Sequence, residues 1–146
     1  MACPYSLHAR HCGHTFCATC ILKWFFSRLH RGCGGWHESV DCPVCRSALY
    51  CTPDLPPRSD FTFPFIPNRT MDGALQGLVN GLTNATDKQG STAVPNALAD
   101  WCEEGHARQE WIRRDKTGRT EMTSLANKWA NLQSLDFVKL RERLGV

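Results

Sequence analysis

Cys12-Gly-His14-Thr-Phe-Cys17-Ala-Thr-Cys20 and Cys42-Pro-Val-Cys45 are the stretches of sequence that decide the fold of this 146-residue chain. Seven of its nine cysteines fall in the first third of the sequence, and four of these form two close Cys-x2-Cys pairs. The N-terminus lacks the apolar segment of a secretion signal, which makes disulfide bonds the less expected use of these cysteines. Soft thiolates with one imidazole favour zinc, held tetrahedrally in a closed structural site.

Two other metal modules fit the spacing less well. In a two-Cys two-His finger about twelve residues would separate Cys20 from the first histidine, and three to five would separate the two histidines. Here nine residues lie between Cys20 and His30, and six between His30 and His37. An iron–sulfur cluster would use four thiolates and has no need of His14. A zinc-stabilised module is therefore predicted, and Cys33 and Cys51 are interpreted as ordinary loop residues.

The order Cys-x-His-x2-Cys-x2-Cys, followed later by Cys-x2-Cys, resembles ligands three to eight of the RING-finger family. The resemblance implies one complete zinc site, made by Cys12, His14, Cys42 and Cys45. It assigns Cys17 and Cys20 to a second zinc, whose other ligands would be a Cys-x2-Cys pair further upstream. The chain has no such pair, and Pro4-Tyr-Ser-Leu7 resembles the stretch that follows it in the family. We therefore expect an N-terminal truncation, with Cys3 as an alternative ligand.

The same resemblance implies an activity and the residues that carry it. In RING ligases the helix after the sixth ligand and the loop at the seventh bind a ubiquitin-conjugating enzyme, which points to Ile21, Trp24 and Pro43 here. Core packing is the alternative role for Ile21. Arg46 follows the last ligand, where a basic residue bridges the conjugating enzyme and its thioester-linked ubiquitin. The implied function is that of a RING-type ubiquitin-protein ligase that promotes transfer to a substrate lysine without a covalent intermediate. The alternative is a degenerate RING that acts only as a zinc-dependent adaptor.

The expected fold class is a small zinc-bound α+β RING domain followed by a mostly α-helical C-terminal region. We predict a partial RING over 1–52, a Pro-rich extended linker over 53–70, a short helix and polar loop over 71–95, and a helical tail over 96–146. Apolar spacing predicts a helix at about 18–29, where it follows Cys17. The alternation of Phe61, Phe63 and Phe65 predicts that the linker lays one aromatic face on the protein.

In the C-terminal region Asp72 is the predicted cap of the short helix, because apolar residues repeat at helical spacing after it. Gly105 and Gly118 are the predicted breaks between the helices of the tail. Its apolar stripes predict helices that pack in a core.

Charge and hydropathy limit the classes of partner. The chain has 17 basic and 14 acidic residues without a run of one sign, so we expect neither nucleic-acid nor membrane binding. No apolar stretch is long enough to span a bilayer. We expect an intracellular protein, cytoplasmic or nuclear, that works with a ubiquitin-conjugating enzyme, ubiquitin and a protein substrate.

Overall fold

The computed structural model describes residues 1–8, 12–49, 56–88 and 96–146. Cys51, interpreted from the sequence as an ordinary loop residue, lies outside the described residues. The elements follow in the order β1 (Pro4–Leu7), β2 (Thr15–Cys17), α1 (Ala18–Ser27), η1 (Asp60–Thr62), β3 (Phe65–Pro67), α2 (Arg69–Lys88), α3 (Asn96–Ala99), α4 (His106–Lys128), η2 (Trp129–Asn131) and α5 (Ser134–Leu144).

A three-stranded antiparallel sheet in the order β2-β1-β3 organises the N-terminal half. The amide of Leu7 donates to the carbonyl of His14 at 2.9 Å, so the sheet holds the segment that carries the first candidate ligands. Strand β2 runs directly into α1, which begins where predicted and ends at Ser27. The predicted α+β character of this half is therefore confirmed by the strands and the helix.

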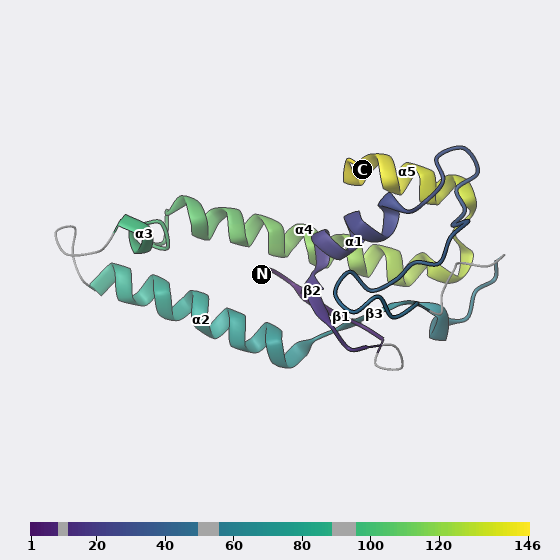
Figure 1. The fold of residues 1–146 in the computed structure, drawn as a ribbon. Coiled ribbons are helices and arrows are strands. Elements are labelled where there is room, and N and C mark those ends of the chain that lie inside the picture. Colours follow the sequence, from purple (N-terminus) through teal and green to yellow (C-terminus); the bar gives the residue numbers. More distant parts are fainter. Residues whose placement is uncertain (9–11, 50–55, 89–95) are drawn as a thin grey trace.

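One hydrophobic core joins this half to the C-terminal helices. Helix α1 packs against both α4 and α5, and the three elements lie close together in Figure 1. Phe25 and Phe26 of α1 are fully buried, and the Phe26 ring lies 6.1 Å from the ring of Phe137 in α5. The guanidinium of Arg141 in α5 donates to the carbonyl of Leu29, just beyond α1. Residues of the predicted RING segment and of the predicted tail thus share one interior.

The segment before α2 packs on this core only in part as predicted. The Phe65 side chain in β3 is buried, and the Phe63 ring lies 5.5 Å from that of Trp129. Phe61, however, lies in η1 and is 90% exposed. A turn of 3-10 helix interrupts the extended geometry there, so the period-two prediction was wrong for Phe61. Arg58 anchors this segment, because its Nη1 donates to the carbonyl of Leu132 at 2.6 Å.

Helix α2 is longer than predicted. It begins at Arg69, and the Asn68 side chain caps it by accepting from the amide of Met71 at 3.0 Å. Asp72, the predicted cap, instead lies in the first turn and forms an ion pair with Arg119 of α4 at 2.6 Å. The sequence pattern misplaced the helix start by about one turn, because a second capping residue precedes Asp72.

The predicted breaks in the tail fall differently. Gly105 directly precedes α4 and ends the preceding turn, as predicted, whereas Gly118 lies inside α4 and is buried.

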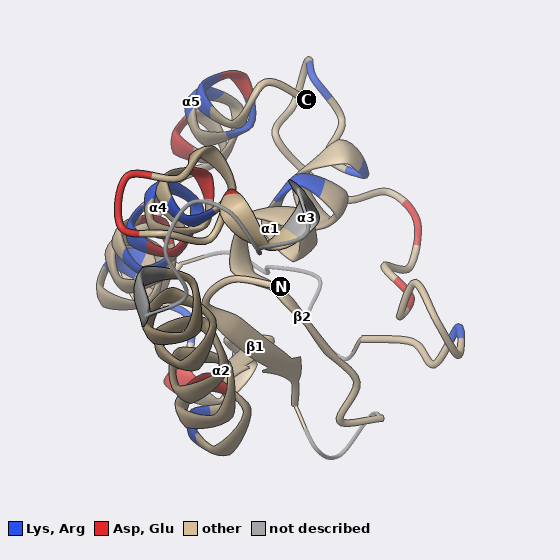
Figure 2. Ribbon diagram, turned by 90° about the vertical axis from the view of Figure 1, so that its left-hand side faces the viewer, with Lys and Arg blue, Asp and Glu red and all other residues tan. Residues whose placement is uncertain are grey.

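Helices α2 and α4 extend side by side away from the sheet, with α3 at the far end (Figure 1). Figure 2 shows both basic and acidic residues on α4 and α5, while α2 carries few charges. No helix of the described segments is both long and apolar enough to cross a membrane.

Candidate metal centre

Cys12 and His14 enter the site on a tight turn just before β2. Gly13 between them has φ +67°, in the left-handed region, and no atom lies within 4 Å of the position that a side-chain Cβ would take there. Glycine adopts this conformation without the steric cost that a side chain brings. The turn therefore lets both neighbouring side chains point to the same side of the backbone.

Cys42 and Cys45 lie on a second turn. An isolated antiparallel bridge joins Asp41 to Ala48, and the amide of Cys42 donates to the carbonyl of Ser47 at 2.8 Å. The amide of Val44 donates to the Cys42 sulfur at 3.4 Å, and Arg46 adopts φ +60° to close the turn. This local network fixes both thiols on one side of the turn.

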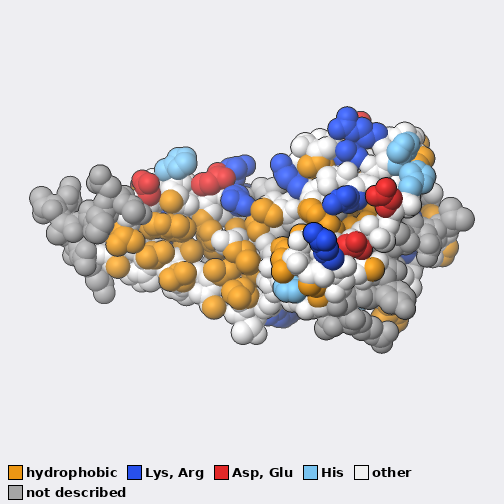
Figure 3. Space-filling model, in the orientation of Figure 1, with side chains coloured by type: hydrophobic (Ala, Val, Ile, Leu, Met, Phe, Trp, Pro, Cys, Tyr) orange, Lys and Arg blue, Asp and Glu red, His pale blue; other side chains and the backbone are white. Residues whose placement is uncertain are grey.

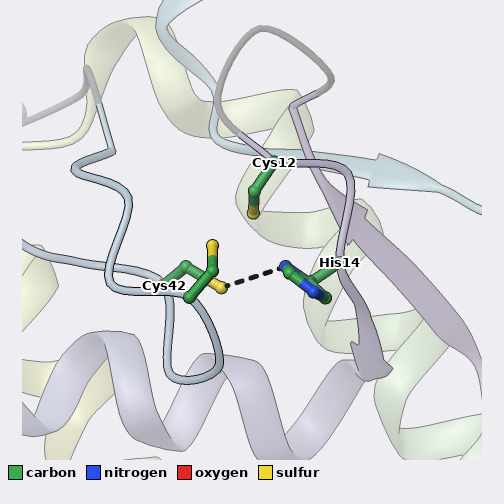
Figure 4. Close-up of side chains that lie close together, drawn as sticks. Cys12, His14 and Cys42 are labelled. Atoms are coloured by element: carbon green, nitrogen blue, oxygen red, sulfur yellow. Dashed lines mark hydrogen bonds between the residues drawn. The ribbon is translucent and has the colours of Figure 1, made fainter.

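The two turns, distant in sequence, bring four ligand atoms together. One ligand atom each from Cys12, His14, Cys42 and Cys45 lies within 4.8 Å of all the others. Figure 4 shows the side chains of Cys12, His14 and Cys42 converging, and His14 Nδ1 lies 3.7 Å from the Cys42 sulfur. Ligand atoms around a tetrahedral zinc are about 3.3–3.8 Å apart, given its bond lengths. Three sulfurs and one imidazole nitrogen at this spacing fit zinc.

The thiols of this cluster differ in their readiness to ionise. The Ser47 hydroxyl, 3.2 Å from the Cys45 sulfur, lowers the pKa of Cys45 to about 6. Burial raises the pKa of Cys12 to about 11, although a hydrogen bond with the His14 backbone opposes it. Zinc binds thiolates and releases their protons, so a metal ion here would overcome the cost of ionising Cys12.

Cys17 and Cys20 do not belong to a complete ligand set within the described residues. Nη2 of Arg114, on α4, lies 3.4 Å from the Cys20 sulfur and 3.7 Å from that of Cys17. Burial raises the pKa of Cys17, but hydrogen bonds with the Thr19 side chain and neighbouring backbone, together with the charge of Arg114, lower it to about 7. Cys3, the alternative ligand, is 2% exposed and does not join a ligand cluster in the described segments. Within the described segments no further ligand joins Cys17 and Cys20, and the Arg114 guanidinium lies beside the two sulfurs.

The other predicted site residues fall in two environments. Pro43 and Arg46 are exposed on the turn that carries Cys42 and Cys45, and Trp24 is half-buried with the Arg28 guanidinium 5.7 Å from its ring centroid. Ile21 is 1% exposed and belongs to the hydrophobic core. Its side chain therefore packs inside the protein, which was the alternative role for this residue.

The structure also brings together three possible metal ligands that were not predicted from the sequence to form a site. His30, Cys33 and His37 each offer a ligand atom within 4.8 Å of the other two. The pattern His-x2-Cys-x3-His is the sequence signal that could have revealed it, but the histidines were weighed only as partners of Cys17 and Cys20.

Comparison with known proteins found a partial relative. A segment of 43 residues is 42% identical to an uncharacterized RING finger protein of Schizosaccharomyces pombe, which amounts to 30% of this chain and 7% of that protein. No family model matches the chain. No solved structure matches it either. The partial match and the Cys12–His14–Cys42–Cys45 cluster together indicate a RING-like zinc finger.

Proposed function

We propose that this chain is the RING-type part of a ubiquitin-protein ligase. In this proposal Cys12, His14, Cys42 and Cys45 hold a structural zinc, and the surface around it binds a ubiquitin-conjugating enzyme. The convergence of four zinc-type ligands from two separate turns carries the proposal. The similarity of 43 residues to a RING finger protein supports it.

The docking surface would consist of side chains that the zinc-bound turn and α1 hold in place. Pro43 and its neighbour Val44, which is 62% exposed, form an apolar tip between the two thiol ligands. Trp24 would add an aromatic anchor from α1, since aromatic and apolar side chains dominate compact interfaces. Ile21 has no part in this surface.

Arg46 would act on the bound thioester. Its side chain is exposed immediately after Cys45, and a planar guanidinium with five donors can engage carbonyls of the conjugating enzyme and of ubiquitin together. Holding the thioester in a reactive geometry lowers the entropic barrier to attack by a substrate lysine. No cysteine of this chain forms a covalent intermediate in this scheme.

Discharge of ubiquitin from a panel of charged conjugating enzymes tests the proposal. We expect the chain to accelerate discharge to free lysine, and expect Arg46→Ala and Trp24→Ala to lose most of the acceleration. Arg113→Ala and Trp111→Ala are matched controls on α4, where Arg113 pairs with Glu110 rather than with a zinc-site residue. Absence of acceleration with every enzyme, or equal loss in the controls, would refute the ligase assignment.

An adaptor without ligase activity is the second candidate. It is motivated by Cys17 and Cys20, which face Arg114 rather than further ligands. Such a protein would bind the charged conjugating enzyme yet leave the discharge rate unchanged. Measuring affinity and discharge on the same sample separates the two functions.

A further inference from the structure

His30, Cys33 and His37 form a compact group on the loop that follows α1. The Cys33 sulfur lies 3.0 Å from His37 Nε2 and 3.3 Å from His30 Nδ1, and the two imidazole centroids are 5.0 Å apart. All three residues are exposed, and histidine side chains are visible at the surface over this loop in Figure 3. Three atoms that can each give a lone pair to a metal thus face one another at the edge of the protein.

The loop holds this arrangement through its own backbone. The amide of His30 donates to the carbonyl of Gly35, and the amide of Gly34 donates to the carbonyl of His30, both at 2.9 Å. Gly34 has φ +66°, and a Cβ there would lie 2.2 Å from the carbonyl oxygen of Ser134. Only glycine allows both this turn and the close approach to the start of α5.

Buried residues anchor both ends of the loop. Leu29 on one side is 2% exposed. Trp36 on the other side is 9% exposed, and its Nε1 donates to the carbonyl of Phe25 at 3.1 Å. A ligand set held between such anchors loses little conformational entropy when it binds an ion.

We propose that His30, Cys33 and His37 form a second, separate metal site that binds zinc with three protein ligands. Two imidazoles and one thiolate are a borderline-soft donor set of the kind that zinc selects. Because the site has three ligands and lies at the surface, its fourth coordination position is open to water or to a side chain of a bound partner. This site shares no ligand with the Cys12–His14–Cys42–Cys45 cluster and does not depend on the ligase proposal.

Counting zinc ions by native mass spectrometry tests the site on the full chain, reduced and equilibrated with zinc. Cys33→Ser and His37→Ala are expected to carry one ion fewer than the wild type. Cys102→Ser and His106→Ala, whose side chains belong to neither cluster, are the matched controls and are expected to keep the wild-type number. An unchanged count in Cys33→Ser and His37→Ala would overturn the proposal.

A second measurement needs only the wild-type protein. Ring-nitrogen NMR signals report which histidine atoms bind a metal, and we expect zinc to shift Nδ1 of His30 and Nε2 of His37. A mild chelator is expected to reverse these shifts before it affects His14, because a three-ligand exposed site binds more weakly than a closed four-ligand site. If saturating zinc moves His14 alone, the second site does not exist.

Discussion

Replacing Gly118 by alanine tests the packing that links the C-terminal helices to the zinc-binding half. Gly118 is buried in α4, where a Cβ would lie 2.9 Å from the Cβ of Ala18 and 3.1 Å from that of Cys3. Real Cβ atoms essentially never approach so closely, so α4 or α1 must shift. Ala18 stands between Cys17 and Cys20, and the shift would therefore reach the helix that carries Trp24.

The expected magnitude comes from two opposing effects. Overpacking of a well-filled interior costs about 1–3 kcal/mol. Alanine is a better helix former than glycine, which returns up to about 1 kcal/mol. We expect a net loss of about 1–2 kcal/mol in the free energy of unfolding. Gly77→Ala in α2 is the control, because no atom lies within 4 Å of its Cβ position, and it should stabilise by about 0.5–1 kcal/mol.

Urea unfolding in excess zinc measures both variants against the wild type. Thermal unfolding should agree, with a fall of about 2–4 °C for each kcal/mol lost in a chain of this size. The opposite signs of the two Gly→Ala changes are the decisive result. A Gly118→Ala protein as stable as the wild type, beside a stabilised Gly77→Ala, would show that α4 and α1 are not in the close contact described.

Three further predictions concern the metal turn, the thiol pair and the end of the core. Gly13→Ala places a side chain at positive φ, which costs about 1–2 kcal/mol. The affinity for zinc, measured by competition with a chelator, should therefore fall about 5- to 30-fold. An unaltered affinity would contradict the turn geometry. The pKa of Cys17 is lowered to about 7, so the stabilising interaction of its thiolate with Arg114 is fully present above pH 9 and is lost as the pH falls through 7. The loss in free energy of unfolding caused by Arg114→Gln, measured in urea, should therefore grow from pH 6 to pH 9. The loss caused by the control Arg113→Gln should stay constant over this range. Arg141→Met removes the donor to the carbonyl of Leu29 and should lower the free energy of unfolding by about 1–3 kcal/mol. An unchanged free energy of unfolding would mean that another donor replaces the guanidinium.

The two ligand pairs of the metal quartet could be predicted from the sequence because the geometry within each pair is local. Cys12 and His14 on one turn, and Cys42 and Cys45 on another, have spacings that each allow two ligands to face one ion. The structure brings both pairs together, as the resemblance to RING fingers implied. The helix after Cys17 could be predicted in the same way, since the spacing of its apolar residues is a local property of the sequence.

The features that were missed depend on contacts between distant segments. Gly118 was predicted to break the helix, yet α4 continues through it. A glycine is present there because a side chain would collide with Ala18 of α1. Ile21 matches a family position for partner binding, yet α1 is covered by helices of the tail and Ile21 is buried. Spacing rules contain no information on which surfaces the rest of the chain will cover.

Sequence by itself determined the ligand types, the turns that pair them and the start of α1, because these follow from side-chain chemistry and short-range backbone geometry. Only the tertiary structure decided that α4 and α5 complete the core around α1, that Arg114 meets Cys17 and Cys20, and that the loop at Gly34 lies against the start of α5. The reason is that these contacts join residues far apart in the chain, and their free energy depends on the fit of buried surfaces, which no short pattern encodes.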